Sequence, residues 1–550
     1  MRSLLVLLAL AACAPAPPPR VEPPAPQLSA GTAQRVVLMS FDGLGADALA
    51  AQADLPAFAA LERDGGSARI IPVNPTATSV THATILTGAQ PRVHGIVANR
   101  FHVPGTPREQ AAQGLETTID AETVVEAARR QGKRVGTVPF PSVDARSPRR
   151  ISDFGFAWTS SVTSARMLHL GRTDFHREWV PPTWTSRPQR RVSYSPIQRA
   201  RIEWSIPDVT RQDVDLVAYD TTNDAAANYD LFLIESGERE VIPDARGWFA
   251  LSAQTSAGLY GSWSKMLHAD PTLNDVTVYW GAISRTSAWP ESFQTTLDAE
   301  IGFWPGIADE RAGLDAQTFI EQMNRLADFL TRAQVLAIQR MPFDLLLAYQ
   351  PEVDTASHRY LGNDTVVRAA FTAADRGIAA VRASLDLTHD ALLVTGDHGL
   401  APIDTEIRMN RLLADHGFAP RWRAFGSNSV AHLYRFEGED DSDAVIAMLN
   451  ATGLFEDVSK KSATAHRNSG DVVAYAKTNV LLSSSSDAPA LAKPSSAGNH
   501  GGLNVHRELH TVLFAAGAGS RGGAMGEWPQ TRIARLIAQL LGIQPPSAAE

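Results

Sequence analysis

Short runs of aliphatic residues alternate with amphipathic stretches along most of the chain from Arg35 onward. The aliphatic runs are typical of strands buried on both faces of a sheet, and the amphipathic stretches repeat apolar residues at helical spacing. Predicted strands cover 36–40, 68–73, 134–139, 344–348, 391–395 and 511–515; predicted helices cover 46–63, 121–131, 316–338, 364–384 and 528–541, and another begins at 79. This alternation indicates βαβ units, and therefore an α/β fold on a doubly wound, mostly parallel sheet.

The pattern changes between residues 191 and 294. Segments such as 214–218 and 276–280 place apolar residues at every second position, with turn residues between the segments. That period is typical of antiparallel strands. We therefore expect an inserted antiparallel β region that divides one catalytic α/β domain into a first part, 35–190, and a second part, 295–550. The tryptophans of the insertion belong either to its core or to a wall that faces the substrate.

Three further runs, at 455–460, 472–476 and 479–482, have strand character. They are predicted to add edge strands near the site at which the larger sheet ends.

The N-terminus has the pattern of an export signal. Arg2 precedes an apolar run at 4–10 that is too short to span a bilayer, and small residues follow it. The sequence Leu10-Ala11-Ala12-Cys13 resembles a bacterial lipobox, which implies cleavage before Cys13 and lipidation of that cysteine. We expect residues 1–13 to be a lipoprotein-type signal peptide and the residues 14–34, rich in proline and alanine, to be an extended tether. The protein would then be exported to the bacterial periplasm or outer surface and contact the membrane only through its lipidated N-terminus; an ordinary signal peptide is the alternative.

Composition narrows the possible partners. The 550 residues carry a formal net charge of −9, whereas proteins that wrap nucleic acid present basic stripes that release counterions. A small phosphorylated substrate remains compatible with this charge, because bound metal ions supply positive charge locally. Cys13 is the only cysteine, so no disulfide can form within the chain.

Residue types that bind metals stand where predicted strands end. Asp42 follows the first strand, Asp354 and His358 follow the strand at 344–348, and the pair Asp397-His398 follows the strand at 391–395. Ligands bind outside the carboxyl ends of strands in open α/β sheets, so these side chains should reach one crevice. Asp354 and His358 are four residues apart, and a helical turn or a tight loop can direct both to one ion. Asp and His are zinc ligands, and a catalytic zinc keeps one position open.

The order of these segments, followed by Gly498-Asn499-His500-Gly501, resembles the alkaline phosphatase superfamily, in particular its nucleotide pyrophosphatase/phosphodiesterase branch. The resemblance extends from residue 35 to about residue 516 and leaves out the tether and the β insertion. Carried over residue by residue, it implies a site with two zinc ions. The first ion would be held by Asp42, Thr78, Asp397 and His398, and the second by Asp354, His358 and His500.

The same resemblance places the nucleophile at Thr78. A hydroxyl needs activation, and a metal ion bound to its oxygen lowers its pKa. The local pattern also allows a purely structural role, in which Thr78 caps the helix predicted from residue 79. With Thr78 as the nucleophile, the resemblance implies a phosphoric-ester hydrolase that passes through a threonyl-phosphate intermediate.

Two positions leave the substrate class open. Diesterases of the branch usually carry Asn three residues after the nucleophile, where this chain has Thr81, whose hydroxyl could donate one hydrogen bond. Related threonine-using monoesterases carry an Asn beyond the next His-Gly, and Asn99 resembles that residue. Those monoesterases also use a Lys-x-Arg clamp that has no counterpart here; Arg146, Arg149 and Arg150 are present in the corresponding stretch and are expected to be solvated.

These observations favour a metal-dependent phosphodiesterase of the nucleotide pyrophosphatase type. Its substrate would be a small phosphorylated molecule such as a nucleotide, and Asn99 and Thr81 would steady the phosphoryl oxygens. An alkaline phosphatase-like monoesterase is the first alternative. A lipoprotein that binds metal without catalysis is an alternative of another class.

Overall fold

The computed structural model describes residues 31–158, 161–177, 191–236, 239–307, 313–520 and 522–550. The predicted signal peptide, Cys13 and most of the predicted tether therefore lie outside the described residues. No helix within the described ranges is both long enough and apolar enough to cross a membrane.

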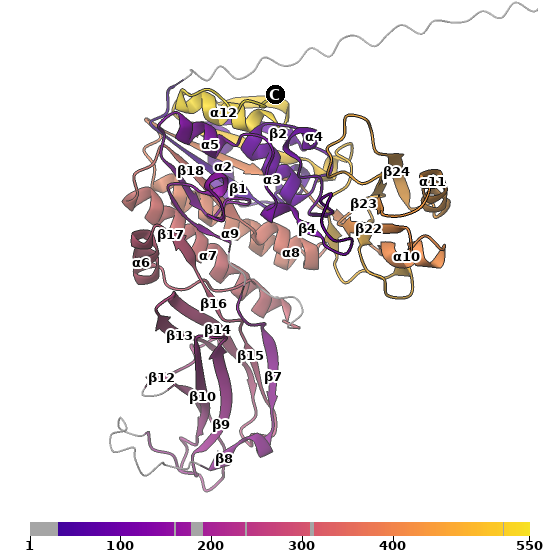
Figure 1. The fold of residues 1–550 in the computed structure, drawn as a ribbon. Coiled ribbons are helices and arrows are strands. Elements are labelled where there is room, and N and C mark those ends of the chain that lie inside the picture. Colours follow the sequence, from indigo (N-terminus) through magenta and orange to yellow (C-terminus); the bar gives the residue numbers. More distant parts are fainter. Residues whose placement is uncertain (1–30, 159–160, 178–190, 237–238, 308–312, 521) are drawn as a thin grey trace, which may run out of the picture.

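A nine-stranded sheet forms the centre of the molecule (Figure 1). Its strands follow the order β17 (Ser287–Trp289), β6 (Phe154–Ala157), β5 (Val135–Val138), β18 (Leu345–Gln350), β1 (Arg35–Phe41), β19 (Asp390–Gly396), β29 (Thr511–Gly517), β2 (Gly66–Ile71) and β30 (Gly523–Pro529). The strands from β6 to β19 are parallel, while β29 is antiparallel to both of its neighbours and β17 is antiparallel to β6. The predicted mostly parallel α/β sheet is confirmed.

Helices cover both faces of this sheet because the strands are apolar on both sides. Alternate side chains of β1 point to opposite faces: Val37 and Met39 enter one core, and Val36 and Leu38 enter the other. The first core also contains α2 (Pro56–Asp64), α6 (Glu291–Glu300), α7 (Ala316–Arg340), α8 (Glu352–Tyr360) and α9 (Asp364–Ala383), and the second contains α3 (Thr78–Thr87), α5 (Val124–Arg130) and α12 (Arg532–Leu541). The sheet therefore lies between two layers of helices.

The predicted helix at 46–63 is wrong in one respect, because the structure has two helices there. The short helix α1 (Ala46–Ala50) ends before Pro56, which begins α2. Proline has no backbone N–H and is favoured in the first turn of a helix, so it separates the two elements.

An elongated lobe of antiparallel strands projects from the sheet (Figure 1). One of its sheets comprises β12 (Arg239–Val241), β11 (Leu231–Ser236), β10 (Thr210–Tyr219), β9 (Gln198–Ile206) and β8 (His176–Arg177); the other comprises β13 (Trp248–Thr255), β14 (Gly258–Ala269), β15 (Val276–Trp280), β7 (Arg166–Leu170) and β16 (Ser284–Arg285). Trp204 and Trp280 are buried in a core that the two sheets share, and Trp248 is buried in the core of the larger domain. These tryptophans are core residues. The predicted β insertion is confirmed, but the β region begins before the predicted residue 191, because β7 and β8 belong to its two sheets.

A second, smaller lobe was not expected from the sequence. In residues 405–483, here called the small lobe, β22 (Trp422–Ser427), β23 (Val430–Arg435), β25 (Val472–Ala476) and β24 (Phe455–Lys460) form a separate sheet with α10 (Met409–Asp415) and α11 (Ser442–Ala451). The strand β26 (Val480–Ser483) pairs with β21 (Thr405–Arg408) in another small sheet. The runs at 455–460, 472–476 and 479–482 are strands, but they do not extend the central sheet because they bury their own core.

Candidate active site

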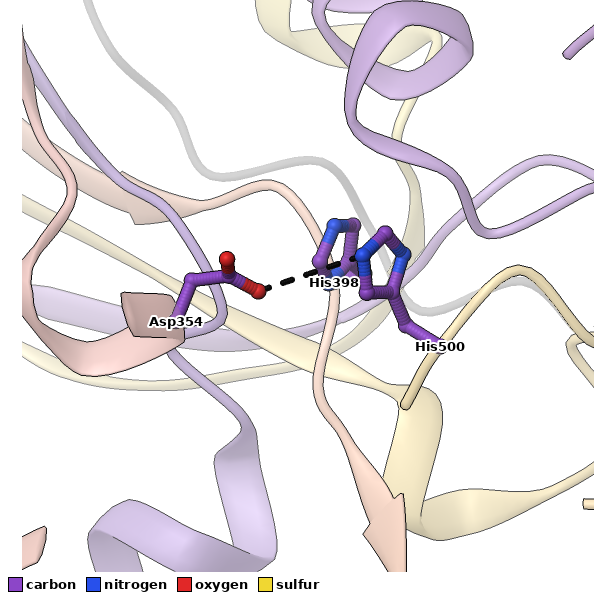
Figure 2. A group of neighbouring side chains, drawn as sticks. All are labelled: Asp354, His398 and His500. Carbon is purple, nitrogen blue, oxygen red and sulfur yellow. Dashed lines mark ion pairs between the residues drawn. The ribbon is translucent and has the colours of Figure 1, made fainter. Parts of the chain in front are cut away.

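The candidate ligands meet at the carboxyl end of the central sheet. Asp42 directly follows β1, Asp397 and His398 directly follow β19, and α8, which follows β18, carries Asp354. The short strand β28 (Gly498–Asn499) brings His500 to the same place. Figure 2 shows Asp354 directed toward the imidazoles of His398 and His500, which come from different parts of the chain. Parallel strands that end at one edge therefore deliver distant residues to one point.

One candidate metal group consists of Asp42, Asp397 and His398. His398 Nε2 lies 3.4 Å from Asp42 Oδ1 and 3.1 Å from Asp397 Oδ2. The backbone N–H groups of Gly43 and His398 donate to Asp397 Oδ1 at 3.0 and 2.8 Å, so the orientation of this carboxylate is fixed. Partners of this kind hold metal ligands in position.

A second candidate group consists of Asp354, His398 and His500. Asp354 Oδ1 lies 3.9 Å from His500 Nε2 and 3.4 Å from His358 Nε2. His358 and Asp354 are both on α8, so the predicted helical turn brings them together. The sequence-based assignment gave His398 to the first ion alone; in the structure His398 lies between the two groups.

The histidine rings are oriented by backbone carbonyls. Nδ1 of His358 lies 2.9 Å from the carbonyl oxygen of Gly498, and Nδ1 of His500 lies 3.0 Å from that of Thr76. A carbonyl only accepts, so each Nδ1 carries the proton and each Nε2 is unprotonated. This is the arrangement in which imidazoles bind metals.

The electrostatics of the buried carboxylates and imidazoles in both groups favour a bound cation. Burial raises the pKa of Asp42, Asp354 and Asp397 well above the ordinary value, and the neighbouring carboxylates raise these pKa values further. Within the described part of the chain, Asp42 Oδ1 and Asp354 Oδ1 are buried without a hydrogen-bond partner. Burial also lowers the pKa of His398 and His500, which keeps both rings neutral. Buried carboxylates with orphaned oxygens and neutral imidazoles fit divalent metal ions, which supply the missing positive charge. Asp42, Asp354, His358, Asp397, His398 and His500 are called the ligand cluster below.

Thr78 lies beside the ligand cluster as the first residue of α3. Its Oγ1 is 3.2 Å from His398 Nε2. The residue that caps α3 is Ala77, and no side chain forms a hydrogen bond to cap this helix. The alternative role of Thr78 as a helix cap is therefore not what the structure shows. His82, one turn further along α3, contacts the carbonyl of Thr78 and Asp397 Oδ2, at 2.9 and 3.4 Å.

Thr81 and Asn99, the two residues that were expected to hold phosphoryl oxygens, have different surroundings in the structure. Thr81 is fully buried, and its hydroxyl lies within hydrogen-bonding distance of the carbonyl oxygen of Ala77 and Asp397 Oδ2, at 3.0 and 3.3 Å. The expectation that Thr81 reaches substrate is wrong on this geometry, because its hydroxyl is used inside the helix and on a metal-ligand residue. Asn99 instead lines the cavity next to Thr78, and its Oδ1 accepts from the backbone N–H of Ser79 at 2.9 Å.

A cavity of about 510 Å³ opens in front of Asp42, Thr78 and Asp354. The part of its lining here called the apolar wall consists of Leu115, Phe140, Trp158, Ile307 and Tyr349. Trp158 packs edge-on against Tyr349 with ring centroids 5.5 Å apart. The hydroxyl of Tyr349 donates to Asp42 Oδ2 at 2.6 Å, so one residue joins the wall to the ligand cluster. The sequence gave no sign of this wall, because its residues come from separate loops and strand ends.

A family model described as type I phosphodiesterase / nucleotide pyrophosphatase matches residues 36–229 and 217–503 of the chain. These ranges cover most of the chain and contain the whole ligand cluster together with Thr78. The protein belongs to the type I phosphodiesterase / nucleotide pyrophosphatase family. Hydrolases of this family act on phosphoric esters and depend on metal ions.

A curated relative agrees with this membership. An uncharacterized pyrophosphatase/phosphodiesterase of Schizosaccharomyces pombe is 28% identical over 171 residues, which is 29% of this chain and 33% of the relative. The chain thus aligns with about a third of that protein.

Solved structures share the fold. Murine ectonucleotide pyrophosphatase/phosphodiesterase 5 superposes with a TM-score of 0.52 at 14% identity, and its inactive threonine-to-alanine variant in complex with AMP superposes with a TM-score of 0.53 at the same identity. Each superposition covers 93% of this chain and 96% of the murine chain. Phosphonoacetate hydrolase from Sinorhizobium meliloti superposes with a TM-score of 0.51 at 15% identity, over 94% of this chain and 100% of its own. At such identities the likeness establishes the fold.

Three arginines near the cavity are engaged in ion pairs. Arg146 pairs with Glu116 at 3.1 Å, and Arg149 pairs with Glu126 at 2.8 Å. Arg150 was expected to be solvated, but it is 7% exposed. Its guanidinium pairs with Asp144 at 2.7 Å and donates to the carbonyls of Leu115 and Thr117. These contacts bury Arg150 against the segment that forms one side of the cavity. Its guanidinium is occupied by them and is not available to bind phosphate.

Proposed function

We propose that this protein hydrolyses phosphodiesters through a threonyl-phosphate intermediate on Thr78. The ligand cluster would hold two divalent metal ions, which we take to be zinc. One observation carries the proposal: Thr78 Oγ1 lies 3.2 Å from His398 Nε2, and His398 belongs to both candidate metal groups. The hydroxyl therefore lies where the two groups meet.

The proposed reaction begins with Thr78 Oγ1 attacking phosphorus as the oxygen of the leaving alcohol departs on the opposite side. The P–Oγ1 bond forms as the P–O bond to the leaving alcohol breaks, the Thr78 proton passes to solvent, and the departing oxygen takes up a proton. Thr78 then carries a phosphoryl group that keeps the second ester. When bound, the metal ions supply charge neutralisation and a lowered hydroxyl pKa. Water then attacks this phosphorus and breaks its bond to Oγ1. One water proton goes to Oγ1, which restores the hydroxyl, and a phosphomonoester is released. Because Asn99 lines the cavity beside Thr78, its amide N–H can donate to a phosphoryl oxygen in both steps.

The charge of the cavity favours a diester over a monoester. Its described lining residues include three carboxylates, Asp42, Asp354 and Glu116, and neither lysine nor arginine. A phosphomonoester carries close to one negative charge more than a diester at neutral pH. Arg146, Arg149 and Arg150 already have carboxylate partners, so the extra charge would have no cationic side chain to meet it. A phosphodiester with an apolar or aromatic ester group would instead place that group against the apolar wall.

A nucleotide-like substrate is the preferred class. Its support is the family itself, whose model is described by nucleotide pyrophosphatase activity, and the binding of AMP by a neighbour in fold. A planar base would stack on the exposed ring of Trp158 in the apolar wall.

The proposal is tested with bis-(p-nitrophenyl) phosphate and p-nitrophenyl phosphate as substrates of the zinc-loaded protein. We expect kcat/KM to be larger for the diester. Faster hydrolysis of the monoester would replace the proposal with an alkaline phosphatase-like activity. Metal binding without hydrolysis of either compound would favour the metal-binding lipoprotein.

We also infer from the sequence that the protein is exported and lipid-anchored through Cys13. The support is the position of the only cysteine directly after Leu10-Ala11-Ala12. Metabolic labelling of bacterial cells that produce the protein with a radioactive fatty acid should label the wild type and not the Cys13→Ala variant. An unlabelled wild type would contradict the anchor.

A further inference from the structure

The turn between β22 and β23 brings a side chain of the small lobe to the ligand cluster. Asn428 occupies this turn with a φ of 62°, in the left-handed region that asparagine tolerates better than most residues. Its side chain lies between Asn99, which lines the cavity, and His500, which belongs to the ligand cluster. Asn428 itself is not among the residues that line the cavity.

The hydrogen-bond network fixes the orientation of both amides. Asn99 Oδ1 accepts from the backbone N–H of Ser79, so the Nδ2 end of Asn99 must be the end that faces Asn428. Asn99 Nδ2 then donates to Asn428 Oδ1 at 3.0 Å. In turn, Asn428 Nδ2 donates to Asn499 Oδ1 at 3.1 Å and lies 3.0 Å from His500 Nε2. Reversing either amide would place two oxygens or two N–H groups against each other.

The turn is supported from several directions. The backbone N–H of Leu482 donates to the carbonyl of Asn428 at 2.6 Å, and the N–H of Ser429 donates to the carbonyl of His500 at 3.0 Å. A Cβ atom added at Gly501 would come within 2.6 Å of Asn428 Cβ, so the turn packs directly on the segment that carries His500. Asn428 is therefore held in place by elements on both of its sides.

We propose that Asn428 is a positioning residue that holds the amide of Asn99 in the orientation needed to bind a phosphoryl oxygen. Asn99 is held at its Oδ1 by Ser79 and at one hydrogen of Nδ2 by Asn428. An amide nitrogen carries two hydrogens, and the second is the one that can donate into the cavity. Without Asn428, Asn99 keeps its bonds to Ser79 at Oδ1 but loses the partner that fixes its Nδ2 end, and the phosphoryl oxygens lose a preorganised donor. The small lobe thereby takes part in the reaction without touching substrate. This inference rests on the proposed function.

The test uses Asn428→Gly, because glycine accepts the positive φ of the turn and removes only the side chain. We expect kcat/KM for bis-(p-nitrophenyl) phosphate to fall about three- to tenfold, the range for loss of one neutral hydrogen bond. Inhibition by inorganic phosphate should weaken by a similar factor, while zinc content stays at the wild-type value. In an Asn99→Ala background, the same Asn428→Gly change should alter kcat/KM by less than about twofold, since no amide remains to be positioned.

Ser484→Ala is the matched control. The Ser484 hydroxyl supports the same hairpin through the backbone of Gly426, at 2.9 and 3.0 Å, and does not contact Asn99. Its kcat/KM should stay close to that of the wild type. The inference is overturned if Asn428→Gly retains full activity, if its effect is equally large without Asn99, if it loses zinc, or if Ser484→Ala shows the same loss. A wild type that hydrolyses no diester would instead refute the proposed function, so the two failures are distinct.

Discussion

The two sides of the cavity are built in different ways. The ligand cluster is attached to the ends of adjacent parallel strands, to helix α8 and to the segment after β28, and buried hydrogen bonds fix members such as Asp397 and His500. The apolar wall comes mostly from loops, and Trp158 and Ile307 are 39% and 46% exposed. Groups that must hold reacting atoms need rigid elements, whereas groups that select a substrate can come from variable loops. We therefore infer that the first side carries the chemistry and the second selects the substrate.

The largest expected effect is loss of the nucleophile on the chemical side. Thr78→Ala should lower kcat about 10³-fold or more, because the covalent path is removed. Zinc content should remain at the wild-type value, since histidine and aspartate side chains form most of the ligand cluster. Thr78→Ser keeps a hydroxyl at the same place and should retain much of the activity. Steady-state kinetics with elemental analysis measures both variants, and an active alanine variant would contradict the assignment.

The next effect concerns the metal ligands. His358→Ala should weaken zinc binding by at least about 100-fold, because even residues that only orient metal ligands contribute roughly 10- to 100-fold. Titration of the chelator-treated protein with zinc, followed calorimetrically, measures the change. His506→Ala is the matched control, since His506 pairs with Glu456 at 2.7 Å and is not part of the ligand cluster. Equal zinc affinity in the two variants would remove His358 from the site.

A third prediction follows from the buried carboxylates. Burial raises the pKa of Asp42, Asp354 and Asp397, so the metal-free protein holds protons there at pH values at which exposed aspartates hold none. A metal ion must displace these protons, so zinc affinity should rise with pH, by about tenfold per pH unit for each proton displaced. Calorimetry in buffers of different ionisation enthalpy counts the protons released. Binding that is independent of pH and releases no protons would contradict this account.

The smallest effect belongs to the apolar wall. Trp158→Ala should raise KM for bis-(p-nitrophenyl) phosphate by about two- to tenfold, the range for one aromatic contact, and leave kcat nearly unchanged. Trp158→Phe retains an aromatic ring and should stay closer to the wild type. A large drop in kcat in the alanine variant would mean that the wall takes part in the chemistry, and the division between the two sides would fail.

The sequence predicted the parts of the site that depend on strand ends. Asp42 and the Asp397-His398 pair each follow an unbroken aliphatic run, so their common position is implied by the α/β rule for ligand sites. The same reasoning predicted the central sheet and the β insertion, because both produce simple periodic patterns.

Features that depend on contacts between distant loops could not be predicted in this way. Asn428 is an ordinary turn residue in the sequence, and only packing of the small lobe on the segment around His500 gives it a role. Arg150 resembles a solvated loop charge until its partners, the carbonyls of Leu115 and Thr117, are known. Thr81 was misplaced because its distance from Thr78 along the chain does not say that its hydroxyl is used within the helix. Hydrogen bonding of this kind is set by tertiary structure.

The most direct test of the central claim is to trap the covalent intermediate. Zinc-loaded protein that is turning over a diester is quenched in acid, digested and analysed by mass spectrometry. We predict a phosphoryl or phosphoryl-ester group on Thr78, and none on this residue after the metal has been removed by a chelator. A modification at another residue, or rapid turnover with Thr78 unmodified throughout, would contradict the account.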